Sequence, residues 1–334
     1  MKKIRWVVSG AAGLAGRKIV RDGLIPVPNC KLVGVHSRAE EHAQREGKRY
    51  RVPWFTSVEE MVKKTDCDAI YIATPQSAHL EEVRISVQYK KHILCEKPLA
   101  TNVQEAEEIL NICKRAKVRL GVNFNYRFHP LHQKMKELIQ KGVIGKIVSG
   151  RCQFGQDYPP AKGAFRQITG LSGGGAFADT GNHAVDLLEY LMDRKTKAVF
   201  GIKKNTIYHY ETEDTGAALL EFSEGGIGLV DAYFCCPLNT LRNDIEINGT
   251  RGTLYTRGTL QMETKGTLIL KKQGETRTFA CPKEDMYKIV FAKFAAAILT
   301  GKEFPIPGED GLHSQKIISA VYRSSGTGRK IAID

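Results

Sequence analysis

Three polar side chains in the middle of the chain are spaced so that a helix would place them on one face. Asp179, His183 and Asp186 follow one another at steps of four and three residues, the spacing at which helical side chains lie above one another. Histidine titrates in the pH range where it can take a proton from a carbinol hydroxyl and return it. The pattern fits dehydrogenation, in which a base accepts that proton as hydride leaves the carbon. The alternative is a structural histidine held by ordinary hydrogen bonds.

A lysine at the end of a predicted strand offers a second group for the same chemistry. The strand predicted to end at Cys95 is followed directly by Glu96, Lys97 and Pro98. Ligands of open α/β sheets bind outside the carboxyl ends of the strands. We therefore expect Lys97 to hydrogen-bond a substrate hydroxyl and the nicotinamide ribose, and so to orient the reacting carbon.

A glycine-rich turn near the start of the chain predicts a phosphate site. The apolar strand Ile4–Val8 runs into the sequence Gly10-Ala11-Ala12-Gly13-Leu14-Ala15-Gly16. A strand, a glycine turn and a helix in this order hold a dinucleotide pyrophosphate on backbone N–H groups. Against the GxGxxG fingerprint, Ala12 takes the place of the second glycine and Ala15 that of the third, unless Gly13 shifts the turn. The alternative is a plain strand-to-helix turn in a sheet that binds no nucleotide.

The end of the second predicted strand favours NADP over NAD. That strand ends His36-Ser37-Arg38, without the carboxylate that usually holds the ribose hydroxyls of NAD. A hydroxyl followed by a guanidinium suits a 2′-phosphate, which arginine can bind through two hydrogen bonds. Alternatively, Arg38 stacks on the adenine ring, which would serve either cofactor.

These motifs together resemble the glucose-fructose oxidoreductase / inositol dehydrogenase / rhizopine catabolism (Gfo/Idh/MocA) family of NAD(P)-dependent oxidoreductases. The likeness runs nearly end to end, and its most specific element is Glu96-Lys97-Pro98, in which a cis Lys97–Pro98 bond is implied. The other matching segments are the glycine loop, Ala73-Thr74-Pro75 with His79, Leu99-Ala100, Asn125–Phe128, Gly173–Asp186 and Asp310-Gly311.

The resemblance implies hydride transfer between nicotinamide and a secondary alcohol or ketone of a sugar, cyclitol or related polyol. It assigns catalysis to Lys97, to His183 as acid and base, and to Asp179 as its partner, while Asp186 braces the helix. The implied cofactor-binding residues are Gly10, Ala12, Gly13, Leu14, Ala15, Ser37, Arg38, Thr74, Pro75, His79, Glu96 and Lys97. The implied substrate-binding residues are Lys97, Tyr126, Arg127, Tyr158, Asp179 and His183. Tyr126, Arg127 and Tyr158 could equally be packing or surface groups.

Two other functions stay open under the same resemblance. Some relatives bind the dinucleotide without turnover, so the chain could be a non-catalytic sensor or regulator. A minority use the cofactor transiently in a glycosidase reaction, which would release sugar with no net change in cofactor. Relatives commonly pair through the open sheet of the second domain, so a homodimer or homotetramer is expected.

The pattern of elements predicts two domains. Residues 1–123 alternate short strands with amphipathic helices, which predicts a doubly wound, mostly parallel Rossmann sheet. Residues 124–334 predict an α+β domain with a large, mainly antiparallel open-faced sheet, for substrate binding and oligomerisation, whose last helix could pack back on the first domain. The predicted strands are Ile4–Val8, Lys31–His36, Ala69–Ala73, His92–Cys95, Arg119–Asn123, Ile147–Phe154, Ala198–Lys203, Ala217–Phe222, Gly226–Phe234, Asp244–Asn248 and Thr267–Lys272. The predicted helices are Ser57–Lys64, Ser77–Tyr89, Asn102–Ala116, one from Pro130, Ala176–Met192 and Gly311–Tyr322.

Composition limits the classes of partner. The net charge of +14 is spread along the chain, without a basic block interleaved with aromatics, so we expect a solvated surface rather than a nucleic-acid site. The start of the chain predicts a strand, no run of about 18 apolar residues predicts a membrane span, and no ligand spacing predicts a metal. The eight cysteines show no paired spacing, which favours a reducing cytoplasm. Vicinal Cys235 and Cys236 are expected as two strand residues facing opposite sides of the sheet rather than as a redox pair.

Overall fold

The computed structural model describes residues 2–334, apart from the side chains of Leu14, Ala15 and Asn239. The chain divides into two compact units. Unit 1 holds the chain up to Asn125 together with Asp285–Leu312, and unit 2 holds Tyr126–Glu284 with His313–Asp334. The chain therefore returns to unit 1 late, after most of unit 2 has been built.

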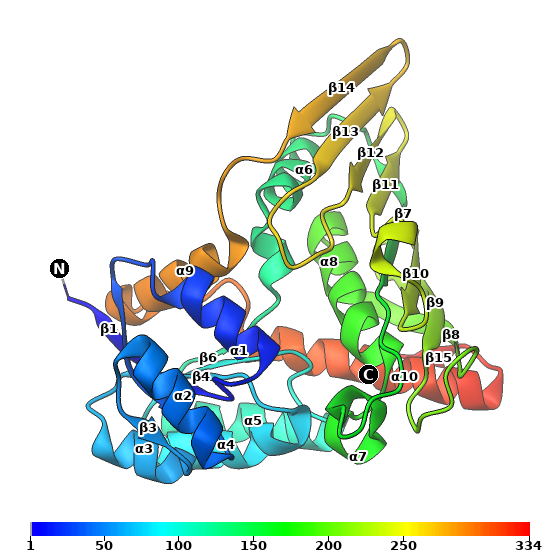
Figure 1. Cartoon of the computed structure of the whole chain (residues 1–334). Helices are drawn as coiled ribbons and strands as arrows, with labels where there is room; N and C mark the ends of the chain where they lie inside the picture. Colours follow the sequence, from blue (N-terminus) through cyan, green and yellow to red (C-terminus); the bar gives the residue numbers. More distant parts are fainter. Residues whose placement is uncertain (1) are drawn as a thin grey trace. The chain divides into compact units, whose positions relative to one another are not determined.

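Unit 1 is a six-stranded parallel sheet in the order β3-β2-β1-β4-β5-β6 (Figure 1). This is the strand order of the dinucleotide-binding Rossmann fold, whose ligands bind where the order reverses, between β1 and β4. Its strands are β1 (Ile4–Ser9), β2 (Cys30–His36), β3 (Trp54–Phe55), β4 (Ala69–Ile72), β5 (His92–Cys95) and β6 (Leu120–Val122). The connecting helices are α1 (Leu14–Ile19), the π-helical turn η1 (Val20–Leu24), α2 (Glu40–Tyr50), α3 (Val58–Lys64), α4 (His79–Gln88) and α5 (Val103–Ala116).

A late helix completes the core of unit 1. Helix α9 (Met286–Thr300) begins at Asp285, whose side chain accepts hydrogen bonds from the backbone N–H groups of Tyr287 and Lys288. Its Phe291 ring meets the buried Trp6 ring of β1 edge to face, with centroids 5.2 Å apart. Such aromatic pairs combine a large buried area with a favourable geometry. The return of the chain therefore fills one side of the Rossmann sheet.

Unit 2 is a nine-stranded mixed sheet in the order β14-β13-β12-β11-β7-β10-β9-β8-β15, in which only the β7–β10 pair is parallel (Figure 1). Helices α6 (Pro130–Gln140) and α8 (Asn182–Met192) pack on one of its faces. Its strands are β7 (Ile147–Gly155), β8 (Thr196–Lys204), β9 (Thr215–Phe222), β10 (Ile227–Tyr233), β11 (Ile245–Gly249), β12 (Gly252–Arg257), β13 (Thr267–Lys272), β14 (Glu275–Ala280) and β15 (Ile331–Ala332). The remaining helices are α7 (Thr169–Ser172) and α10 (Gly308–Thr327), which runs from unit 1 into unit 2.

The predicted fold class is confirmed, and all the predicted strands are present, with ends that differ from the predicted ones by at most two residues. The two-residue β3, helices α2 and α9, and strands β12, β14 and β15 were not predicted. The prediction that Cys235 and Cys236 are both strand residues is wrong. Strand β10 ends at Tyr233, and Cys235 forms only an isolated bridge with Asp157.

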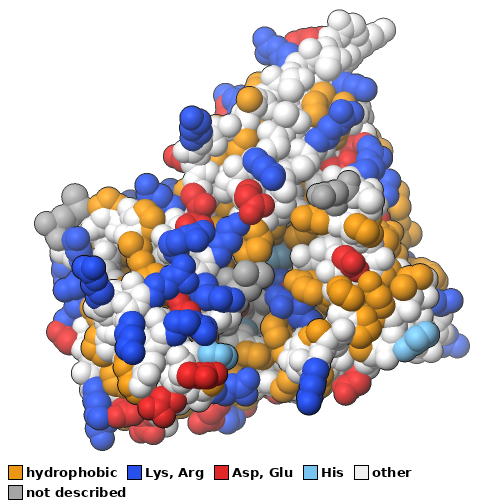
Figure 2. Space-filling model, in the orientation of Figure 1, with side chains coloured by type: hydrophobic (Ala, Val, Ile, Leu, Met, Phe, Trp, Pro, Cys, Tyr) orange, Lys and Arg blue, Asp and Glu red, His pale blue; other side chains and the backbone are white. Residues whose placement is uncertain are grey.

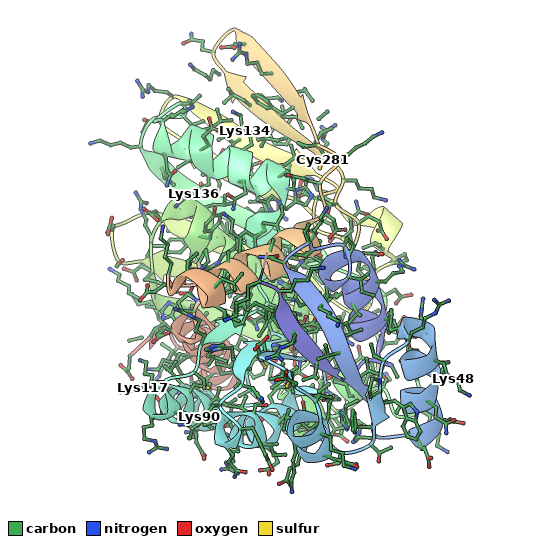
Figure 3. The ribbon with its side chains drawn as sticks, turned by 90° about the vertical axis from the view of Figure 1, so that its left-hand side faces the viewer. Lys48, Lys90, Lys117, Lys134, Lys136 and Cys281 are labelled. Atoms are coloured by element: carbon green, nitrogen blue, oxygen red, sulfur yellow. The ribbon has the colours of Figure 1, made fainter. Side chains whose placement is uncertain are left out.

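Basic side chains come from many separate elements. Figure 3 labels Lys48 on α2, Lys134 and Lys136 on α6, and Lys90 and Lys117 just after α4 and α5. The last two lie close together, because the Lys90 ammonium is 3.4 Å from the carbonyl of the residue before Lys117. Among residues 2–334, no helix combines the length and the apolar character that crossing a bilayer would require.

Candidate active site

The glycine turn lies at the carboxyl end of β1, pressed against the end of β4. Gly10 has φ +78°, and a Cβ added there would lie 2.4 Å from the carbonyl oxygen of Ala73. The Gly13 N–H donates to the Gly10 carbonyl at 3.0 Å, which closes a turn directly before α1. Gly10 therefore meets both requirements for glycine, a left-handed backbone and room for a close approach.

The third glycine of the motif differs from the predicted one. A Cβ on Gly16 would lie 2.5 Å from the Gly10 carbonyl oxygen, so Gly16, and not Ala15 as expected for the third position, allows α1 to pack closely on the turn after β1. The glycines therefore follow a spacing of three, Gly10, Gly13 and Gly16. The side chains of Leu14 and Ala15, both predicted to bind cofactor, lie outside the described residues.

The residues proposed for the adenosine ribose follow β2. Ser37 is buried, Arg38 is exposed, and the Ser37 N–H donates to the carbonyl of Phe55 at 3.2 Å. Just before them, the buried His36 lies with its Nδ1 2.8 Å from the Ser9 hydroxyl, which precedes the glycine turn. Burial lowers the pKa of His36. A neutral His36 thus ties the end of β2 to the end of β1 and leaves the exposed guanidinium of Arg38 as the cation at this edge.

His79 ties together the loops that follow β4 and β5. It is fully buried, its Nε2 is 3.0 Å from the Thr74 carbonyl oxygen, and its Nδ1 is 3.1 Å from the Leu99 carbonyl oxygen. Burial lowers the pKa of His79, and because a neutral imidazole has one N–H, the ring donates to one of these two carbonyls at a time. Pro75 begins the short helical turn that leads into α4. His79 therefore fixes the backbone at Thr74 and Pro75 from beneath.

Glu96 and Lys97 are held at the carboxyl end of β5. The Glu96 carboxylate accepts hydrogen bonds from the Tyr71 hydroxyl and from Asn123 Nδ2, the latter at 2.6 Å. The Lys97 N–H lies 3.3 Å from the other oxygen of Glu96, and the Lys97–Pro98 bond is cis, as the resemblance implied. Burial raises the pKa of Glu96. These contacts fix the backbone from which the Lys97 side chain extends.

A buried carboxyl group that no sequence motif indicates, Glu82, lies beside the same loops. Glu82 of α4 is 6% exposed, and burial raises its pKa from 4.5 to about 7, while the Ser9 and Thr74 hydroxyls and the Arg38 charge act in the opposite direction. Glu82 therefore lies close to Ser9, directly before the glycine turn, and to the loop at Thr74. A helical pattern cannot reveal such a group, because Glu81 and Glu82 look alike in sequence.

Glu82 predicts a pH dependence of the stability of the Rossmann fold. Between about pH 4.5 and pH 7 the folded protein keeps a proton that the unfolded chain has lost. The free energy of unfolding should therefore fall as pH rises through this window, by roughly 3 kcal/mol in total. In denaturant titrations at pH 5 and pH 8, Glu82→Gln should remove this difference in the free energy of unfolding between the two pH values. Glu81→Gln, on the exposed face of the same helix, should leave this difference unchanged. An equal difference in both variants would refute the assignment of the pH dependence to Glu82.

In unit 2, the segment after the glycines forms the predicted helix with one irregularity. Residues Phe177–Gly181 form a π-helical turn, η5, which continues into α8. Asp179 lies in that π turn, is 6% exposed, and accepts a hydrogen bond from Arg166 Nε at 2.8 Å. Inserted π turns are frequent at functional sites. Arg166 was not predicted, because its contact with Asp179 depends on how the loop folds.

Arg166 also brings Tyr158 to the same cluster. The guanidinium carbon of Arg166 lies 5.3 Å from the centre of the Tyr158 ring, and Tyr158 packs edge to face on Phe234 with centroids 4.6 Å apart. Burial raises the pKa of Tyr158. Tyr158, Arg166 and Asp179 thus form one charged and aromatic group.

His183 lies on α8 against aromatic rings. It is 7% exposed, and its ring meets the Tyr126 ring edge to face with centroids 4.8 Å apart. The neighbouring Arg127 makes a buried two-point ion pair with Asp186, with Nε to Oδ2 at 2.9 Å and the second contact at 2.5 Å. Such fork-to-fork pairs are geometrically specific. Asp186 therefore holds Arg127 against α8, and Tyr126 is carried with it to His183.

No group of three or more His, Cys, Asp or Glu side chains within residues 2–334 is arranged to hold a metal ion.

Family models match most of the chain. Residues 4–124 match the model described as an oxidoreductase family with an NAD-binding Rossmann fold, and residues 132–255 match the GFO/IDH/MocA C-terminal domain. Together these matches cover the parallel sheet of unit 1 and most of the strands of unit 2.

Similar proteins match over most or all of the chain. A 1,5-anhydro-D-fructose reductase of Ensifer adhaerens is 28% identical over 99% of this chain and 98% of its own. A D-xylose 1-dehydrogenase (NADP(+)) of Haloarcula marismortui is 28% identical over 80% of this chain and 75% of its own. The crystal structure of an aldose-aldose oxidoreductase of Caulobacter crescentus, complexed with glycerol, has a TM-score of 0.92 at 21% identity, over 99% of this chain and 100% of that one.

Proposed function

Because the chain belongs to the GFO/IDH/MocA family of oxidoreductases, we propose that it moves a hydride between NADP and a secondary alcohol or ketone of a sugar or related polyol. The observation that supports this proposal is the left-handed glycine turn at Gly10, which lies at the carboxyl end of β1, where the strand order reverses and dinucleotides bind in this fold. The named activities of the relatives, a reductase and a dehydrogenase of sugars, give the substrate class.

The residues of unit 1 fit a dinucleotide. A side chain at Gly10 would overlap the Ala73 carbonyl, so glycine lets the turn after β1 pack closely on the end of β4, as the tight first turn of a dinucleotide site requires. Gly13 begins α1 without a side-chain cap, which leaves helix N–H groups for the phosphate oxygens. Arg38 and Ser37 would hold the ribose end. When bound, the nicotinamide supplies the hydride or takes it up.

The remaining chemistry is the movement of one proton. We propose that His183 takes the proton of the substrate hydroxyl and returns it in the reverse direction. Asp179, fixed by Arg166, orients the substrate beside it. Lys97 is proposed to hydrogen-bond the same hydroxyl, so that the oxygen is held while the carbon reacts. Tyr126 and Tyr158 would line the substrate site.

The proposal is tested by incubating the protein with NADP and NAD and a panel of aldoses and polyols that includes D-xylose. It is tested in the other direction with NADPH and 1,5-anhydro-D-fructose. We expect a change in the absorbance of reduced nicotinamide with at least one sugar. Tight cofactor binding without turnover would indicate a sensor or regulator, and sugar release without net change in cofactor would indicate a glycosidase.

Arg38 is expected to set the preference for NADP. Replacing it with alanine should weaken NADP binding by about 10- to 100-fold, because a charge-assisted hydrogen bond is worth roughly 1.5–3 kcal/mol. NAD binding should change by less than about threefold. Arg115→Ala, which removes an exposed arginine of α5, controls for net charge. Isothermal titration decides the matter, and wild-type protein that binds NAD and excludes NADP would contradict it.

The open face of the unit 2 sheet is proposed as a contact between two copies of the chain. Phe200 on β8, Leu219 on β9 and Leu229 on β10 are 41%, 45% and 44% exposed, and Leu219 is paired across the sheet with both of the others. Figure 2 shows hydrophobic side chains gathered over these strands. Exposed apolar patches of this kind mark interaction sites.

A charge in that face should dissociate the oligomer. Leu219→Glu is expected to give monomer in analytical ultracentrifugation under conditions in which the wild type forms dimers or tetramers, because burying an unpaired carboxylate is costly. Ile25→Lys, at a 48% exposed position in unit 1, should leave the assembly unchanged. An unaltered oligomer in Leu219→Glu would rule out this surface.

The eight cysteines of the described chain are all free thiols, which suits a cytoplasmic setting for the protein.

A further inference from the structure

One residue of unit 2 binds three consecutive backbone N–H groups where the helix that carries Asp179 begins. Three consecutive N–H groups at the start of that helix all donate to Glu213. The Gly175 N–H reaches one carboxylate oxygen at 3.0 Å, the Phe177 N–H reaches the other at 3.0 Å, and the Ala176 N–H reaches the Glu213 carbonyl at 2.9 Å. The first N–H groups of a helix have no partner within it. Glu213 therefore supplies what a capping residue within the helix would normally supply.

Gly174 and Gly175, which precede the helix, allow the close approach of Tyr322 and Glu213. A Cβ on Gly175 would lie 1.9 Å from the Glu213 carbonyl oxygen, and a Cβ on Gly174 would lie 2.0 Å from the Tyr322 hydroxyl oxygen. The Tyr322 hydroxyl of α10 donates to the same Glu213 carboxylate at 2.6 Å. Glu213 is 2% exposed, so its carboxylate accepts hydrogen bonds from the Gly175 N–H, the Phe177 N–H and the Tyr322 hydroxyl away from bulk water.

The residue before Glu213 fixes the partner of Asp179. The Thr212 hydroxyl donates to the backbone carbonyl of Arg166 at 2.8 Å, and the Arg166 side chain in turn binds the Asp179 carboxylate. Two consecutive residues just before β9 thus position the ion pair. Glu213 binds the start of the helix that carries Asp179, and Thr212 binds the backbone of Arg166. The separation of the Asp179 carboxylate and the Arg166 guanidinium therefore depends on this one segment.

We propose that Glu213 is a positioning residue, which sets the place and the direction of Asp179, and through the same turn of His183, for the reaction. This inference rests on the proposed function. Its physical basis is that a displacement of about 1 Å at a reacting group can lower a rate about 100-fold. A glutamine at this position would offer one acceptor oxygen where the carboxylate offers two, and would turn an N–H₂ group toward an N–H.

The test compares Glu213→Gln with a matched control, Glu189→Gln. Glu189 lies near the C-terminal end of α8 and is 6% exposed. It accepts hydrogen bonds from the Thr196 N–H at 2.7 Å and from His313 at 2.8 Å, and so anchors the opposite end of the same helix to its surroundings. We expect Glu213→Gln to lower kcat by about 10- to 100-fold with an unchanged Kd for NADP, which unit 1 alone would bind. Glu189→Gln should lower the Tm at least as much and change kcat by less than about twofold.

Amide hydrogen exchange provides a readout that does not need activity. In Glu213→Gln the amides of residues 175–177 should exchange at least about 10-fold faster than in the wild type, while those of Leu187 and Leu188 keep their protection. Tyr322→Phe, which removes only the hydroxyl, should show the same effect more weakly and covers the case in which Glu213→Gln does not fold. Unchanged protection at residues 175–177, or full kcat despite lost protection, would overturn the inference. A wild type without turnover would overturn the proposed function instead, and the exchange data would still decide whether Glu213 holds the turn.

Discussion

Replacing Lys97 with methionine is expected to lower kcat by about 10²- to 10⁴-fold, the range that general acid–base groups contribute. The expected reason is loss of the ammonium that orients the reacting hydroxyl. Methionine keeps the unbranched apolar part of the side chain, and the contacts that Glu96 makes with Tyr71 and Asn123 do not involve the lysine side chain. The fold of the β5 loop and the affinity for NADP should therefore survive. Steady-state rates and cofactor titration measure the two effects separately.

The control for this variant is Lys63→Met, which removes an exposed lysine of α3 and should leave kcat within about twofold of the wild type. If Lys97→Met retains more than about a tenth of the wild-type rate, Lys97 is not a catalytic group. If it loses NADP affinity to the same extent as rate, the lysine acts in cofactor binding alone.

Gly10→Ala is expected to be the most damaging change in the cofactor site. The left-handed conformation at φ +78° costs an alanine about 1–2 kcal/mol. The new methyl group would also stand 2.4 Å from a backbone oxygen that cannot move aside without disturbing β4. We expect the unfolding free energy to fall by about 3 kcal/mol or more and NADP binding to weaken by at least about 100-fold.

A matched glycine separates the two causes. Gly301 follows α9 in the same unit, has φ +76°, and has nothing within 4 Å of an added Cβ. Gly301→Ala should therefore lose only the cost of the backbone conformation, about 1–2 kcal/mol, and should bind NADP normally. Denaturant unfolding and calorimetric titration give both numbers, and equal losses in the two variants would show that the close contact at Gly10 has no effect.

The local parts of the fold could be predicted because their signals are local. The strand Ile4–Ser9, its glycine turn and the helix after it were legible from apolar residues and glycines in one short window. The role of Gly16 was not, because it depends on the register in which α1 crosses the turn. The sequence placed a helix over Asp179 and His183 correctly but could not indicate the π turn, since side-chain spacing of four is compatible with either geometry.

The contacts that were missed join residues far apart in the chain. Arg166 with Asp179, Arg127 with Asp186, and Glu213 with Gly175 are pairs 13, 59 and 38 residues apart. No single window contains both members of the longer pairs, and arginine and glutamate in loops look like surface residues. The return of Asp285–Leu312 to unit 1 was missed for the same reason. Phe291 packs against Trp6, which lies near the other end of the sequence.

The central claim, that this chain moves a hydride between a sugar carbon and nicotinamide, is tested most directly with isotope. Wild-type protein and Lys97→Met would be incubated with NADP and a panel of aldoses and polyols, D-xylose labelled at C1 among them, each carrying deuterium on its carbinol carbons. We predict that deuterium from at least one sugar appears at C4 of the nicotinamide with the wild type and is nearly absent with Lys97→Met. Cofactor that binds to the wild type yet stays unlabelled with every sugar would contradict the account.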